Sequence, residues 1–72
     1  MAVVPWSKLE IYFVTAFEAH GQVERQDVID IAFSEDESDD VIDAIDYIGS
    51  RVFRTVDAAK EFLKTNNQIS ES

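Results

Sequence analysis

The chain of 72 residues has no cysteine, one proline, two glycines and one histidine, and only six residues are lysine or arginine. Without a thiol it has no disulfide framework and no cysteine-ligated zinc site, and the single imidazole of His20 leaves no histidine pair for a metal. No run approaches the about 18 consecutive apolar residues of a membrane span, and the first residues lack the basic start and apolar middle of a signal peptide. We therefore expect a cytoplasmic protein that does not associate with membranes.

Apolar residues and acids, in contrast, are abundant. Hydrophobic residues make up 46% of the chain and aromatic residues 11%, which is enough apolar material for one compact core at this length. Fifteen residues are aspartate or glutamate, so the formal net charge is −9. Length and composition together predict a single small domain.

The excess of acid is confined to the middle of the chain. Residues 1–23 and 47–72 are each close to neutral, whereas residues 24–46 hold ten acids and only Arg25 as a cation. The ten acids are Glu24, Asp27, Asp30, Glu35, Asp36, Glu37, Asp39, Asp40, Asp43 and Asp46. Like charge at this density repels itself, so such a surface serves either solubility or a partner of opposite sign.

The first predicted helix starts at a capping box and ends at a glycine. Ser7 and Glu10 stand three residues apart, a spacing at which each side chain can bond the other residue's backbone N–H. A stripe with spacings of three and four then predicts a broad buried face, formed by Leu9, Phe13, Ala16, Phe17 and His20 and widened by Tyr12 and Ile11. Gly21 supplies the left-handed residue that ends a helix.

Two further helices are predicted over residues 24–33 and 38–48, with a short polar turn between them. Ser38 is the expected N-cap of the later helix, and Gly49 ends it. The apolar stripe of the earlier helix is Val28, Ile29, Ala32 and Phe33, and that of the later helix is Val41, Ala44, Ile45 and Ile48. The acids lie on the remaining sides of both helices.

The last third of the chain predicts an extended segment followed by a helix. Residues 51–55 alternate polar and apolar side chains, and the expected strand partner is the segment 22–23. Thr55 can cap a final helix over residues 56–64, which would bury Ala59, Phe62 and Leu63. The expected division is an extended N-terminal arm (1–6), one helical domain (7–64) and a flexible polar tail (65–72).

These elements predict a mainly α fold: a small four-helix domain with a short two-stranded ribbon. Their order resembles the winged helix-turn-helix architecture, with residues 24–33 and 38–48 in the places of the paired helices. The turn between them has no glycine, and the helix in the recognition position is acidic where DNA readers of that family are basic or polar. In size and charge the chain is also similar to small acidic inhibitor proteins of phages and mobile elements. The acidic helix would repel phosphates, so direct nucleic-acid binding is disfavoured.

No catalytic or metal-binding motif is present. An EF-hand loop started at Asp36 would place Val41 where glycine is needed and Tyr47 where the bidentate glutamate belongs. His20 falls at a helix end, where a histidine more often caps carbonyls than catalyses. We therefore expect a protein that is not an enzyme and needs no cofactor or metal.

The acids suggest a surface for a protein partner with a basic face. On a helix, Asp39, Asp43 and Asp46 project from successive turns roughly 5–6 Å apart, a separation of the same order as that of neighbouring phosphates on a strand. The expected function is a non-catalytic inhibitor or regulator that docks on a basic nucleic-acid-handling protein as a nucleic-acid mimic. The expected contact residues are Asp27, Asp30, Asp36, Asp39, Asp40, Asp43, Asp46 and, as an apolar anchor, Tyr47. The alternative interpretation of these acids is that they only solvate the outer helix faces.

The alternative function is a homo-oligomeric or adaptor domain that uses an exposed aromatic surface. A homodimer is one such oligomer. The chain has many large aromatic side chains for a core this small. Phe13, Phe17 and Phe62 are expected inside. Trp6 and Tyr47 are the expected interface candidates.

Overall fold

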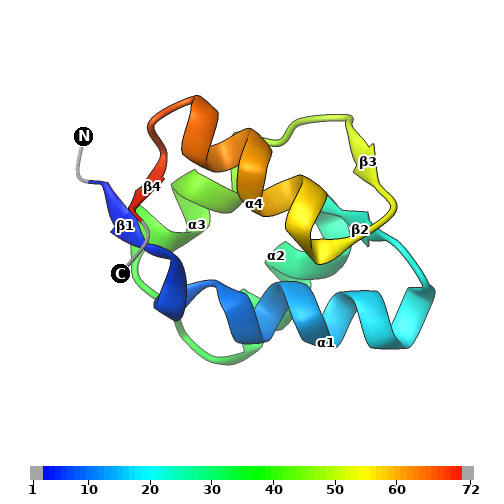
Figure 1. The fold of residues 1–72 in the computed structure, drawn as a ribbon. Helices are drawn as coiled ribbons and strands as arrows, with labels where there is room; N and C mark the ends of the chain where they lie inside the picture. Colours follow the sequence, from blue (N-terminus) through cyan, green and yellow to red (C-terminus); the bar gives the residue numbers. More distant parts are fainter. Residues whose placement is uncertain (1–2, 71–72) are drawn as a thin grey trace.

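The computed structural model describes residues 3–70 and has a mainly α fold, with four helices and two short ribbons (Figure 1). This fold class is the one predicted. Along the chain the elements are β1 (Val4–Pro5), the 3₁₀ helix η1 (Trp6–Lys8), α1 (Glu10–His20), β2 (Val23–Glu24), α2 (Arg25–Ser34), α3 (Asp39–Asp46), β3 (Val52–Phe53), α4 (Val56–Thr65) and β4 (Ile69–Ser70).

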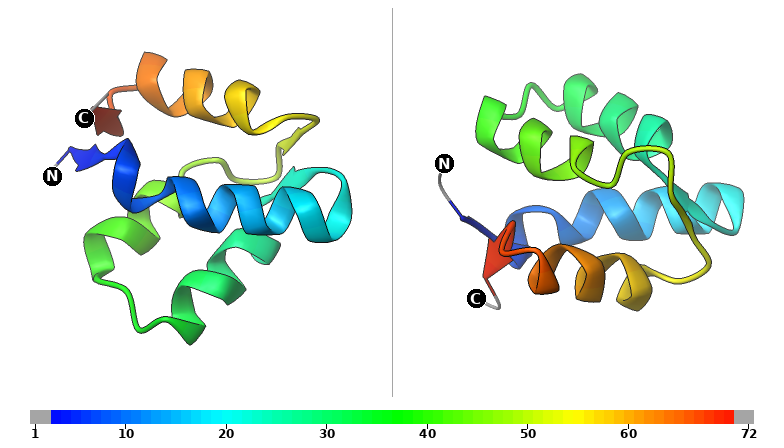
Figure 2. Two further views of the ribbon diagram at one scale, coloured as in Figure 1. Left: turned by 60° about the horizontal axis from the view of Figure 1, so that its bottom comes forward. Right: turned by 90° about the horizontal axis from the view of Figure 1, so that it is seen from above.

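Helix α1 is the central element. Both views of Figure 2 show it between α4 on one side and the α2–α3 pair on the other. One core fills the space between these helices, because each presents an apolar stripe to α1. The largest side chains that are fully buried are Phe13, Leu9, Ile45, Ile48, Leu63, Val23, Val28 and Val41.

The start of α1 differs from the prediction. The helix begins at Glu10 after a 3₁₀ turn, its N-cap is Leu9, and no side chain caps it, so the Ser7 capping box was wrong. The turn buries Trp6 against Phe13, with ring centroids 5.3 Å apart. Burial of a tryptophan outweighs one capping bond, which is worth about 1 kcal/mol. The predicted end is confirmed, because Gly21 is left-handed with φ of 75°.

Helices α2 and α3 follow their predicted stripes with one exception. Val28, Ile29 and Ala32 of α2 are buried, as are Val41, Ala44 and Ile45 of α3. Phe33 was placed in the core and is instead 64% exposed, so that prediction was wrong. Ser38 is the N-cap residue of α3, but its side chain makes no capping bond. Gly49 follows α3 with φ of 60°.

The predicted ribbon is confirmed, shifted by one residue on its first strand. β2 pairs antiparallel with β3, so that Val23 faces Phe53 and Glu24 faces Val52. Thr55 caps α4 as predicted, because its Oγ1 accepts the Ala58 N–H at 3.1 Å.

The two ends of the described chain form a second ribbon. β1 and β4 pair in parallel, with Val4 opposite Ile69, and both residues are buried. The predicted arm therefore contains a strand and a buried Trp6, and residues 65–70 are not a polar tail. The predicted boundaries at residues 6 and 65 were wrong in this respect, because a long-range strand pair joins the two segments. No helix within the described part of the chain has the length and apolar character needed to cross a membrane.

Candidate acidic docking surface

The ten acids of the central segment lie on β2, α2, α3 and the turn between the helices, which we call the acidic hairpin (residues 24–46). The two helices pack against each other, and their apolar stripes face the core. The acids are therefore left on the outer surface. None of them is buried, and seven of the ten are exposed.

Asp39, Asp43 and Asp46 lie along the outer side of α3, which we call the α3 ridge. Their spacing of four and three residues places them on successive turns roughly 5–6 Å apart. Val41 and Ile45 point the opposite way, into the core. These three predicted site residues therefore share one exposed side of a single helix.

Asp46 differs from the other acids of the ridge because a cation lies beside it. Arg25 Nη1 donates to Asp46 Oδ1 at 2.8 Å and ties the first turn of α2 to the last turn of α3. Both side chains are partly exposed, so the pair contributes at most about 1 kcal/mol. No ion pair among the described residues involves Asp39, Asp40 or Asp43. The uncompensated charge is therefore concentrated in the first turns of α3.

Asp27 and Asp30, the expected extension of this surface on α2, differ in exposure and in their partners. Asp30 is exposed and accepts a hydrogen bond from Gln26 Nε2 at 2.8 Å. Asp27 is half-buried on the side of α2 that faces α1, where its Oδ1 lies 3.7 Å from His20 Nε2. Asp27 therefore lies beside α1, at the margin of the acidic surface, and its part in the contact stays a prediction.

The turn of the acidic hairpin is built on Asp36, which has a left-handed backbone with φ of 59°. Its N–H donates to Phe33 O at 3.1 Å, and the Glu37 N–H donates to Ala32 O at 3.2 Å, the two bonds of a Schellman motif. Glycine is the usual residue at this position because a side chain strains the left-handed conformation. Asp36 thus holds an exposed carboxylate at the tip of the hairpin where glycine would be less strained.

Glu37 connects this turn to α1. The Tyr12 hydroxyl donates to Glu37 Oε2 at 2.5 Å, and the Ser38 N–H donates to Oε1 at 3.2 Å. These bonds, that from Tyr12 first, favour the ionised carboxylate and hold the pKa of Glu37 below its usual value. The bond to Glu37 is also the main reason that the pKa of Tyr12 is raised to about 12. Glu37 is therefore an ionised link between the turn and α1.

Tyr47, the expected anchor, lies at the edge of the acidic hairpin. It stands one turn after Asp43 and is 41% exposed. Its ring stacks on Phe62 of α4 with centroids 5.8 Å apart, and its hydroxyl donates to Asn66 Oδ1 at 3.3 Å. The Arg51 guanidinium lies 4.5 Å from the centroid of the same Phe62 ring. Tyr47 therefore borders both the acids of α3 and the cations that follow it in the chain.

The predictions for two other aromatic residues, Trp6 and Phe33, differ from the structure. Trp6 was expected at an interface, but it is 5% exposed, so that prediction was wrong. Phe33 was missed, and it is the most exposed large hydrophobic side chain in the described part of the chain. A helix turns by about 100° per residue, which places Phe33 at the margin of a stripe centred on Val28 and Ala32. This marginal position is the feature of the sequence that could have indicated that Phe33 is exposed.

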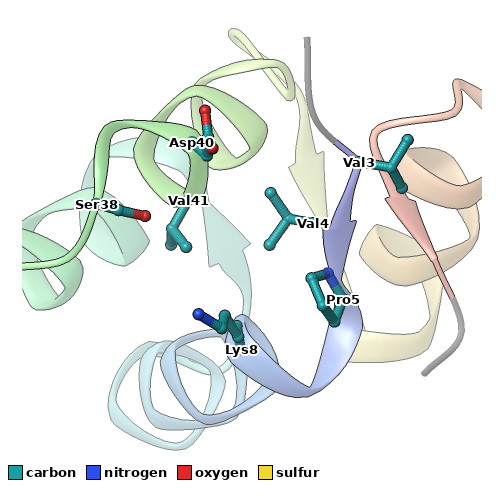
Figure 3. A pocket seen from close by; sticks show the side chains of 7 residues that line it. All are labelled: Val3, Val4, Pro5, Lys8, Ser38, Asp40 and Val41. Atoms are coloured by element: carbon teal, nitrogen blue, oxygen red, sulfur yellow. The ribbon is translucent and has the colours of Figure 1, made fainter.

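Shallow hollows open on two sides of the acidic hairpin. One, of about 100 Å³, lies between β1 and the start of α3, with Lys8 and Asp40 on opposite sides of it (Figure 3). Another, of about 360 Å³, lies between α1 and α2 and is lined by Ile11, Tyr12, Thr15, Ile31 and Glu35. No group of three or more histidine, aspartate or glutamate side chains within residues 3–70 is arranged to hold a metal ion.

No family model, curated protein or solved structure matches this chain. The winged helix-turn-helix resemblance and the likeness to small acidic inhibitors therefore stay predictions. The functional proposal depends on the charges and geometry of the described residues.

Proposed function

We propose that the protein is a non-catalytic binding module whose acidic hairpin docks on a basic protein surface. The partner is a nucleic-acid-handling protein that this chain inhibits or regulates. The observation that carries the proposal is the confinement of charge, because the acidic hairpin accounts for the whole net charge of −9. Like charges held this close destabilise a compact domain, and a partner of opposite sign removes that repulsion.

The α3 ridge is the centre of the proposed contact. Asp39 and Asp43 are exposed and have no ion pair among the described residues, and Asp36 and Asp40 add carboxylates beside them. Carboxylates on successive helical turns can occupy sites at which a basic protein binds successive phosphates. Tyr47 supplies apolar area at the margin. This arrangement favours mimicry of a nucleic acid over binding to one.

The proposed partner also suggests where the protein acts. Proteins that handle nucleic acid work inside the cell, so we place the complex in the cytoplasm. The small size and acidity of the chain suit an inhibitor carried by a phage or mobile element, which must bind its target tightly with few residues.

The test uses the wild-type protein and a triple variant, Asp39→Asn, Asp43→Asn and Asp46→Asn, as immobilised baits in a lysate of the source organism. We expect the wild type alone to capture a basic nucleic-acid-binding protein, and that protein to elute at roughly 0.5 M salt, where charge pairs are screened. Once purified, the captured protein should lose affinity for duplex DNA when the wild-type chain is added.

A matched control changes the net charge by the same amount elsewhere. Glu10, Glu18 and Asp57 are exposed on α1 and α4, and their replacement by Gln, Gln and Asn should leave capture intact. Equal capture by the wild type and the ridge variant would show that α3 is not the contact. Equal loss in both triple variants would show that only total charge matters, and the proposal would then fail.

A further inference from the structure

We propose that the protein associates with itself head to tail, and that the segment Arg51–Arg54 of one copy docks in the hollow between α1 and α2 of the next. This inference does not depend on the proposed function, because it involves neither the α3 ridge nor a basic partner protein. It rests on two surfaces of the same molecule that complement each other in charge and in apolar area.

The hollow combines an apolar lining with an acidic rim. Ile11 of α1 is 60% exposed, and Ile31 of α2 and Tyr12 complete the apolar lining. Glu35 lines the hollow at the C-terminal end of α2. Asp27 lies one turn before Ile31 on α2, beside His20 at the other end of α1, so Glu35 is the acid at the hollow. The hollow thus fits an apolar side chain that has a cation beside it.

The Arg51–Arg54 segment presents such a pair of side chains. Alternation along β3 places Val52 and Phe53 on opposite sides of the strand. Phe53 packs on Phe62 of α4, with ring centroids 5.6 Å apart, which turns Val52 away from the core, and Arg54 follows in the bend after β3. Val52 is 49% exposed, and Arg54 is exposed. In the proposed contact Val52 covers Ile11 and Ile31, and Arg54 pairs with Glu35.

A single copy cannot make this contact within itself. The hollow opens beside Ile11 and Thr15 in the first half of α1, whereas β3 pairs with β2, which follows α1 beyond Gly21 (Figure 1). Six to ten residues of helix, or about 9–15 Å, separate these positions. The contact therefore joins different surfaces of two copies, and it extends to a third copy unless the rotation closes a ring.

The distribution of charge selects this arrangement over a symmetric one. Two copies that met through their acidic hairpins would place like charges against each other, whereas the head-to-tail contact places Arg54 against Glu35. Repulsion between whole molecules of net charge −9 is screened beyond about 8 Å at physiological ionic strength, while pairs in contact are screened less. The proposed contact is therefore weak and populated at high protein concentration.

Sedimentation equilibrium of the full chain tests the proposal between roughly 10 μM and 1 mM at about 0.15 M salt, a range that detects weak association. We expect the average mass to rise with concentration above that of the monomer. A monomer across the whole range would overturn the proposal, whereas a mass that levels off at the dimer would support a ring of two copies that make the contact twice.

Charge exchange between the two surfaces tests their pairing. Glu35→Arg and Arg54→Glu should each weaken association about tenfold, because attraction becomes repulsion. An equimolar mixture of the two variants should restore it, since each altered surface then meets its complement. Both side chains are exposed, so circular dichroism should show unchanged helix content.

A third variant separates the proposed contact from a general effect of net charge. Asp43→Arg alters the charge by the same two units as Glu35→Arg, but on the α3 ridge, and it should associate as the wild type does. An Asp43→Arg variant as weak as Glu35→Arg would refute the proposed site. Failure of the mixture to recover association would refute the pairing of the two surfaces. Neither result bears on the bait experiment above.

Discussion

Replacement of Ile69 by alanine should destabilise the protein strongly, although the sequence alone places this residue in a polar tail. Ile69 is 5% exposed and lies opposite Val4 in the β1–β4 ribbon. Its preceding residue, Gln68, accepts the Val4 N–H at 3.2 Å. The side chain therefore closes the core at the end of the molecule where the two terminal strands meet.

The expected magnitude follows from the atoms removed. Isoleucine to alanine deletes three carbon atoms, worth about 2.4 kcal/mol at about 0.8 kcal/mol each. A short ribbon at the edge of the core can partly collapse onto the gap, which places the loss at about 2–3 kcal/mol. With about 2.1 cal/mol/K of unfolding entropy per residue over 72 residues, the melting temperature should fall by about 13–20 °C.

Thermal and urea unfolding followed by circular dichroism measure this loss in dilute protein. Ile11→Ala is the matched control, because it removes the same atoms from a side chain that is 60% exposed, and it should change stability by less than about 0.5 kcal/mol. If Ile69→Ala proves no more destabilising than Ile11→Ala, the terminal ribbon does not hold the core together and the reasoning is wrong.

Four further predictions concern local features of the fold. Glu37 has a lowered pKa in the folded state, so its ionised carboxylate stabilises the fold at pH values above the ordinary pKa of 4.5. This contribution is lost as the pH falls through the lower, folded-state pKa. In urea unfolding over that range, the free energy of unfolding of Tyr12→Phe should therefore fall less than that of the wild type. In the wild type, an absorbance titration should find Tyr12 ionising near pH 12, and an ordinary value would contradict its bond to Glu37. Asp36→Gly should raise the free energy of unfolding by about 0.5–1 kcal/mol by removing left-handed strain, and a decrease would argue against that strain. Thr55→Ala should lower it by about 1 kcal/mol while Thr55→Ser preserves it, and equal loss in both would exclude the cap as the cause.

Local signals predicted most of the helical framework. The stripe of Val41, Ala44 and Ile45 identified the buried side of α3, and Gly21 marked the end of α1 because its left-handed backbone disfavours other residues. The Thr55 cap is equally local, since its acceptor and the Ala58 N–H are three residues apart. Such features depend on a few neighbouring residues, so they can be deduced from the order of side chains.

Predictions failed where the outcome depended on segments far apart in the chain. Trp6 looked like an exposed aromatic before a helix, but it packs on Phe13 because η1 folds back. Ile69 looked like one apolar residue among polar ones, and only its pairing with Val4 buries it. Phe33 was assigned to the core by spacing, but no neighbouring element covers that margin of α2.

The candidate site divides in the same way. The side of α3 that carries Asp39 and Asp43 follows from helical spacing alone. The partner of Asp46 and the direction of Asp27 do not, because they depend on how α2 packs against α3 and α1. Helical spacing therefore predicted the ridge, whereas the packing of the three helices decided which acids belong to it.

The amino-acid sequence by itself determined the helices, the confinement of acid to residues 24–46 and the outward side of α3, because these follow from side-chain type and the period of the helix. The tertiary structure alone decided that the two ends of the chain form a ribbon and that Trp6 is buried. It also decided that the α1–α2 hollow and the Arg51–Arg54 segment lie at opposite ends of α1. These outcomes arise from contacts between distant segments, whose formation depends on how all the apolar faces pack together at once.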